Sequence, residues 1–157
     1  MFDEPNNKIA AEMMAKASLE AGIAFNNSSV TLVHGMSRPI GALFHVPHGI
    51  SNAMLLSECL NFALDGAIER FVQLAKNIDC KISNDDKETA KTFLLETEKL
   101  CKHCKIPTLE QYGIDKNKFL SLIDKMADDA LISGSPSNTR KLITKEDIIK
   151  LYHNLWK

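Results

Sequence analysis

Residues 30–56 read VTLVHGMSRPIGALFHVPHGISNAMLL, an apolar stretch in which glycine and histidine are concentrated. Glycine inside a helix costs about 1 kcal/mol relative to alanine, so three glycines here indicate that another segment approaches this backbone closely. Pro39 and Pro47 predict a bend and a break in the helical path. The stretch therefore predicts a helix that carries His34, then a kink, and a tight turn at residues 45–49 that leads into the next helix.

Three of the five histidines of the chain lie in this stretch: His34, His45 and His48. The predicted turn can bring His48 back beside His34, although the two are 14 positions apart. Two neutral imidazoles that converge in an apolar setting are good ligands for a divalent transition metal. A histidine on an apolar helix face is also commonly a hydrogen-bonded core residue, so this alternative stays open. A small independent metal-binding protein that uses all three histidines is a further possibility.

The rest of the chain predicts helices. Apolar residues recur at helical spacing, and no stretch alternates apolar and polar residues as a half-buried strand does. Asp115 is a predicted N-cap, and Thr144 with Asp147 predicts a capping box. Three expected helices span residues 7–25, 49–64 and 67–78. A fourth begins in the acidic cluster 85–88 and ends before Pro107, a fifth begins at Asp115 and ends before Gly134, and the last begins at Thr144. The sequence thus predicts an all-α bundle of about six to eight helices in a single domain, residues 1–157, with 133–143 as a surface loop.

Composition excludes several classes of protein. The chain has 157 residues and a net charge of −1, so it lacks the excess positive charge that binds a nucleic acid backbone. Its apolar runs are too short to cross a membrane, and its first residues do not resemble a signal peptide. Four cysteines in a helical chain of this length are expected to be reduced, which predicts a cytoplasmic location. The single Cys101-x-x-Cys104 motif has too few ligands for a structural zinc site.

Residues 32–56 closely resemble the signature of the iron-containing (group III) alcohol dehydrogenases, in their helical C-terminal domain, which belongs to the dehydroquinate synthase-like superfamily. The resemblance covers nearly the whole chain. It continues through segments that look like those of the family in the same order: Ala21-Gly-Ile-Ala-Phe-Asn-Asn, Ile106-Pro-Thr-Leu, Tyr112-Gly-Ile, Met126-Ala-Asp-Asp-Ala-Leu, Ser133-Gly-Ser-Pro-Ser-Asn and Thr144-Lys-Glu-Asp-Ile.

The resemblance implies an NAD(P)-linked oxidoreductase for small alcohols and aldehydes. Such enzymes hold one divalent metal, usually iron and sometimes zinc, with one Asp and three His, and His34 and His48 match the last two of these ligands. Many members have another histidine one turn after the first of these two, where this chain has Arg38. That departure puts a proton relay at this position in doubt, although an arginine could still steer a polar or anionic substrate. The alternative is that Arg38 is a plain surface charge. His45 is expected in the substrate cleft or as a solvated turn residue.

Nothing in the sequence resembles the α/β dinucleotide-binding half of these enzymes, and the other two metal ligands belong to a helix upstream of this stretch. The sequence therefore predicts a truncated C-terminal piece that is inactive alone, in which NAD or NADP binds only through the missing domain. Its expected partner is that missing half, or a second copy of the chain. The alternative is a non-catalytic helical binding or structural module that retains the family fold.

Overall fold

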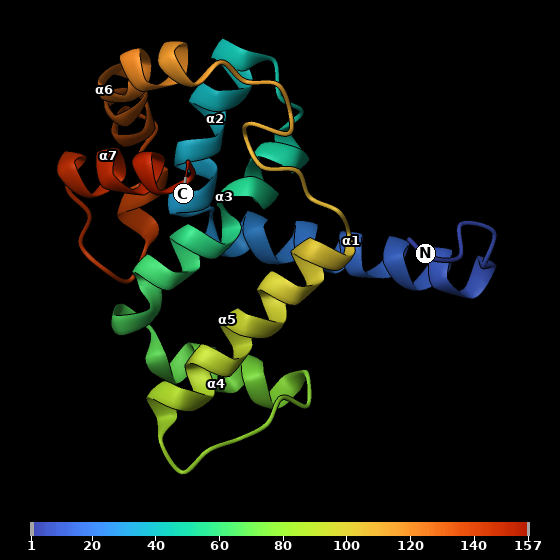
Figure 1. Cartoon of the computed structure of the whole chain (residues 1–157). Coiled ribbons are helices and arrows are strands. Elements are labelled where there is room, and N and C mark those ends of the chain that lie inside the picture. Colours follow the sequence, from blue (N-terminus) through green and yellow to red (C-terminus); the bar gives the residue numbers. More distant parts are fainter. Residues whose placement is uncertain (1, 157) are drawn as a thin grey trace. The chain divides into compact units, whose positions relative to one another are not determined.

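The computed structural model describes residues 2–156, and every regular element in this range is a helix (Figure 1). The described elements are α1 (Lys8–Ser28), α2 (Leu32–Phe44), α3 (His48–Ala63), η1 (Leu64–Gly66), α4 (Ile68–Asn77), α5 (Asp86–His103), α6 (Lys116–Ile132), η2 (Ser135–Asn138) and α7 (Lys145–Asn154). The prediction of an all-α fold with six to eight helices is confirmed. None of these helices is long and apolar enough to span a bilayer.

The chain divides into two compact units, Met1–Val30 and Thr31–Lys157. The first unit consists mainly of α1, which begins after Asn7, whose side chain accepts a hydrogen bond from the Ala10 N–H at 3.0 Å. None of the residues of α1 is buried. Several of its large apolar side chains are exposed: Ile9, Met13, Met14, Leu19, Ile23 and Phe25.

In the second unit, α2 is the most buried helix and packs against α3, α6 and η2. Its buried residues are Leu32, Val33, Gly35, Met36, Ser37, Pro39 and Ile40. The main core continues into α6 and α7, where Phe119 is fully buried and contacts three aromatic rings. Its ring centroid lies 5.4 Å from Phe44, 5.8 Å from Tyr152 and 5.4 Å from Trp156. This aromatic cluster joins the end of α2 to α6 and α7.

The segment 133–143 is not simply a surface loop, as its composition predicted. It contains η2, whose first residues Ser135 and Pro136 are buried. Pro136 packs against Gly35 so closely that a Cβ at Gly35 would lie 2.8 Å from two carbons of the proline ring. A loop rich in Ser, Pro and Gly therefore closes over α2 because α2 offers a position without a side chain.

Helix α2 continues through Pro39 to Phe44 as one element. Proline removes one backbone donor from a helix interior. A buried hydroxyl lies beside this weakened turn: Tyr152 donates to the Met36 carbonyl at 2.8 Å. Burial raises the pKa of Tyr152, so the hydroxyl keeps its proton. At the start of α2, Thr139 Oγ accepts the Leu32 N–H at 3.1 Å, so this helix end is capped from a distant part of the chain.

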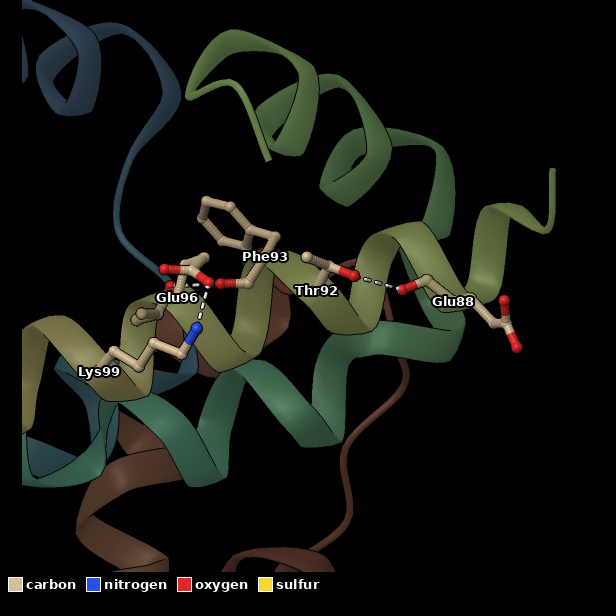
Figure 2. A network of polar contacts seen from close by, with 6 residues as sticks. Glu88, Thr92, Phe93, Glu96 and Lys99 are labelled. Atoms are coloured by element: carbon tan, nitrogen blue, oxygen red, sulfur yellow. Dashed lines mark hydrogen bonds and ion pairs between the residues drawn. The ribbon is translucent and has the colours of Figure 1, made fainter. Parts of the chain in front are cut away.

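A smaller core lies between α4 and α5, which pack side by side at the far end of this unit (Figure 1). Its buried members are Leu64, Phe71, Val72, Ala90 and Leu94. Two of the polar contacts along α5 are local: the Thr92 hydroxyl donates to the Glu88 carbonyl at 3.1 Å, and Lys99 pairs with Glu96 at 2.6 Å (Figure 2). Such exposed pairs within one helix contribute little to stability.

The predicted helix starts in the C-terminal half are confirmed. Asp115 accepts a hydrogen bond from the Lys118 N–H at 2.6 Å, as an N-cap does. Thr144 and Asp147 form the reciprocal pair of a capping box at the start of α7. These caps are local interactions, which explains why the sequence pattern located them.

Replacing Gly35 by alanine should destabilise the second unit, because the added Cβ would overlap the Pro136 ring. Overpacking of this kind costs about 1–3 kcal/mol, measured as a lower midpoint of urea unfolding. Gly49→Ala is the matched control in α3, since nothing lies within 4 Å of its added Cβ. The control should be neutral or stabilising by up to about 1 kcal/mol. Equal effects of the two substitutions would contradict the close packing of α2 on η2.

Candidate functional site

The two histidines predicted to converge come from consecutive helices. His34 lies in the first turn of α2, and His48 is the first residue of α3. The chain reverses between them through His45, whose φ of 55° is left-handed, and through Val46, which is 3% exposed. A Cβ on Gly41 would lie 3.3 Å from the Val46 carbonyl oxygen, so the turn packs back onto α2. The two imidazole rings come to a centroid separation of 5.3 Å with planes inclined at 56°.

The surroundings of His34 favour a neutral ring. Its side chain is half-buried, while that of His48 is exposed. Burial lowers the pKa of His34. His48 and Arg38 lower it further, because a positive charge on the His34 ring would be repelled by a positive charge on either neighbour. A lowered pKa favours the unprotonated imidazole, which is the form that can coordinate a metal.

The separation of the two rings fits a shared metal ion. A zinc–nitrogen bond is about 2.1 Å long, and the ring centroid lies about 1.1 Å beyond the nitrogen, so two imidazoles on one tetrahedral ion have centroids about 5.2 Å apart. The observed 5.3 Å is compatible with this distance, and it is also an ordinary separation of two packed rings. Two nitrogen donors are suited to iron or zinc.

These two imidazoles would by themselves form only part of a metal site. Within residues 2–156, no three side chains of His, Cys, Asp or Glu come together in a group that could hold a metal ion. All four cysteines are free thiols, and burial is the main cause that raises the pKa of Cys101 in the Cys101-x-x-Cys104 motif. A complete catalytic site usually has three or more protein ligands, so the two imidazoles do not make such a site by themselves.

Asn52 is a site residue that the sequence analysis missed. It lies one turn after His48 on α3, and its amide nitrogen Nδ2 is 3.1 Å from His48 Nε2. Its other amide atom, Oδ1, is buried and has no hydrogen-bond partner in the described part of the chain. The spacing of four residues from a candidate ligand was the available signal, because such residues share one face of a helix.

The other two predicted site residues are exposed. Arg38 lies one turn after His34 on α2 and forms no ion pair with a carboxylate of the described residues, although its charge acts on His34. His45 lies in the turn itself, between the helices that carry His34 and His48. His103 and His153, predicted to be surface residues, are exposed on α5 and α7.

Comparison with known proteins gives consistent matches. Residues 1–156 match the family description "Fe-containing alcohol dehydrogenase family, C-terminal". Lactaldehyde reductase of Escherichia coli K12 is 33% identical over 152 residues, covering 96% of this chain but 39% of that protein. NADPH-dependent butanol dehydrogenase of Clostridium saccharobutylicum is 30% identical over 147 residues, covering 93% of this chain and 38% of that protein.

Solved structures agree with the observed fold. A crystal structure of 1,3-propanediol oxidoreductase superposes with a TM-score of 0.88 at 28% identity, covering 96% of this chain and 39% of that one. The alcohol dehydrogenase from Oenococcus oeni gives a TM-score of 0.83 at 27% identity, with 98% and 40% coverage. The chain therefore spans about two fifths of the length of the relatives that it matches.

Calorimetric titration of the untagged chain with Zn²⁺, and with Fe²⁺ under anaerobic conditions, should show one-to-one binding. His34→Ala/His48→Ala should weaken it by roughly tenfold or more, about 1.4 kcal/mol, because both nitrogen donors are removed. The control His103→Ala/His153→Ala removes two exposed histidines that lie elsewhere and should leave the affinity unchanged. Binding that survives in the first double variant would exclude the His34–His48 pair as the metal ligands.

Proposed function

This chain belongs to the Fe-containing alcohol dehydrogenase family, because residues 1–156 match the C-terminal part of that family. We propose that it is the metal-binding helical half of a metal-dependent, NAD(P)-linked alcohol dehydrogenase. The observation that supports this most directly is the pair of imidazoles, His34 and His48, at a ring separation suited to one shared ion. Its substrates in the complete enzyme are small alcohols and the corresponding aldehydes or ketones.

His34 and His48 would hold a divalent metal, Fe²⁺ first and Zn²⁺ second. When bound, such an ion polarises a carbonyl oxygen or lowers the pKa of an alcohol. The chain's own contribution is to orient two neutral nitrogen donors that leave the charge of the ion undiminished. The lowered pKa of His34 serves this role because it keeps the lone pair of the ring available.

The complete reaction needs groups that lie outside this sequence. A nucleotide-binding domain and the remaining metal ligands must be supplied by another part of the enzyme, on the same or on a separate polypeptide. Since the chain spans 39% of lactaldehyde reductase, the unmatched remainder is large enough for such a domain. We expect the 157-residue chain alone to be inactive.

A chimera provides the test. The chain replaces the matching C-terminal part of E. coli lactaldehyde reductase, and NAD(P)H oxidation is followed with small aldehydes after the metal is loaded. We expect metal-dependent turnover that is abolished by His34→Ala/His48→Ala. The control His103→Ala/His153→Ala should retain it.

The same chimera distinguishes the alternative function. A chimera that folds, binds the nicotinamide cofactor and takes up metal, yet reduces none of the aldehydes tested, would favour a non-catalytic helical module with the family fold. The absence of a three-residue metal group within the described chain is the observation that keeps this alternative in view.

Arg38 would face the substrate, because it lies one turn from His34 and its guanidinium has no carboxylate partner in the described structure. A guanidinium binds carboxylates with two parallel hydrogen bonds, so Arg38 favours aldehydes that carry a carboxylate. His45, which is exposed in the turn, would lie at the edge of the cleft that receives the substrate.

Arg38→Gln in the chimera should lower kcat/KM for a carboxylate-bearing aldehyde by roughly tenfold, about 1.4 kcal/mol, and leave a neutral aldehyde of similar size unaffected. Arg140→Gln is the matched control, since Arg140 is an exposed arginine that follows η2. An equal loss for both substrates would mean that Arg38 does not recognise the anionic group.

A further inference from the structure

One polar side chain next to the imidazole pair has an unexplained contact. The amide of Asn52 meets His48 Nε2 at 3.1 Å, and both residues lie on the first two turns of α3. The backbone of this turn is also held, because the Ser51 hydroxyl donates to the His48 carbonyl at 3.0 Å and Ser51 is fully buried. The amide therefore meets the ring from a regular helical turn.

The direction of the hydrogen bond follows from what is left unpaired. With Nδ2 toward His48, the atom left without a partner in the described chain is the buried carbonyl oxygen Oδ1. If the amide were turned over, a buried N–H would be left unpaired in its place. Orphaned buried N–H groups are rarer than under-satisfied carbonyls, so the arrangement in which Asn52 donates is favoured.

A ring nitrogen that accepts a hydrogen bond cannot carry the proton of a neutral imidazole. If Asn52 donates to Nε2, the proton of His48 is therefore on Nδ1. We propose that Asn52 is a positioning residue that holds His48, in the metal-free chain, in the tautomer with the proton on Nδ1 and the lone pair on Nε2. This inference rests on the proposed function only in its purpose, which is to keep the proton off Nε2 so that a divalent metal can take the lone pair of that nitrogen.

The arrangement also defines what must happen when a metal is bound. An ion held by His48 would take the Nε2 lone pair that the amide occupies, so Asn52 would release His48 and find another acceptor. Asn52 thus acts through His48 and is itself no ligand.

The test is the tautomer of His48, read from the two ring ¹⁵N shifts of the 157-residue chain. Spectra are recorded without metal, about two pH units above the ordinary imidazole pKa of roughly 6.5. The wild-type ring should carry its proton on Nδ1. Asn52→Asp has nearly the same shape but can only accept, so the proton should move to Nε2.

Asn52→Leu removes the hydrogen bond with little change in size, and the ratio of Nδ1–H to Nε2–H tautomers should fall about fivefold. Asn61→Leu, an exposed position on the same helix, is the matched control and should keep the wild-type tautomer. Unfolding midpoints of all variants identify any that fail to fold. Asn52→Asp remains informative if Asn52→Leu does not fold.

A wild-type His48 that carries its proton on Nε2 would overturn the inference, as would an Asn52→Asp variant with the wild-type tautomer. Zinc titration distinguishes failure of this inference about Asn52 from failure of the proposed function. A chain with the Nδ1–H tautomer but no zinc affinity would contradict the proposed metal site and support the role of Asn52. Zinc that shifts His48 Nε2 in the wild type supports both.

Discussion

The close approach of α2 and η2 at Gly35 and Pro136 is the contact on which the arrangement of the second unit depends. There is no space for a methyl group between them. Because η2 covers α2 so closely, and α3 and α6 also pack against it, α2 is buried along much of its length. Because His34 is the neighbour of Gly35, the same contact fixes the position of one imidazole. A structural requirement and a candidate functional residue thus occupy adjacent positions.

Two long-range hydrogen bonds complete the hold on α2. The Tyr152 hydroxyl reaches Met36 beside the turn that Pro39 weakens, and Thr139 caps the start of the helix at Leu32. Both partners come from the last quarter of the chain. Because Thr31 provides no side-chain cap, the Leu32 N–H at the start of the helix would otherwise lack the partner that Thr139 supplies. The C-terminal region therefore supports the helix that carries His34.

The imidazole pair is electrostatically suited to a cation and structurally incomplete. Burial and neighbouring groups favour the neutral form of His34, and the 5.3 Å separation of the rings matches two donors on one ion. An exposed Arg38 and a half-buried Asn52 lie one turn beyond each ring on their respective helices. The proposed metal site, substrate contact and tautomer control are therefore all built from the first turns of α2 and α3.

Local patterns in the sequence were sufficient for the helical fold class, the caps at Asp115 and Thr144, and the choice of His34 and His48 as candidates, because helical periodicity and capping involve residues a few positions apart. The resemblance to a family came from residues 32–56 together with further short segments along nearly the whole chain. Only the tertiary structure decided that α2 continues through Pro39, that η2 is partly buried, and that Asn52 meets His48. The first two depend on contacts between residues about a hundred positions apart, which no local pattern records. The third depends on which way a side chain on a known helix face is turned, and that is determined by packing around it.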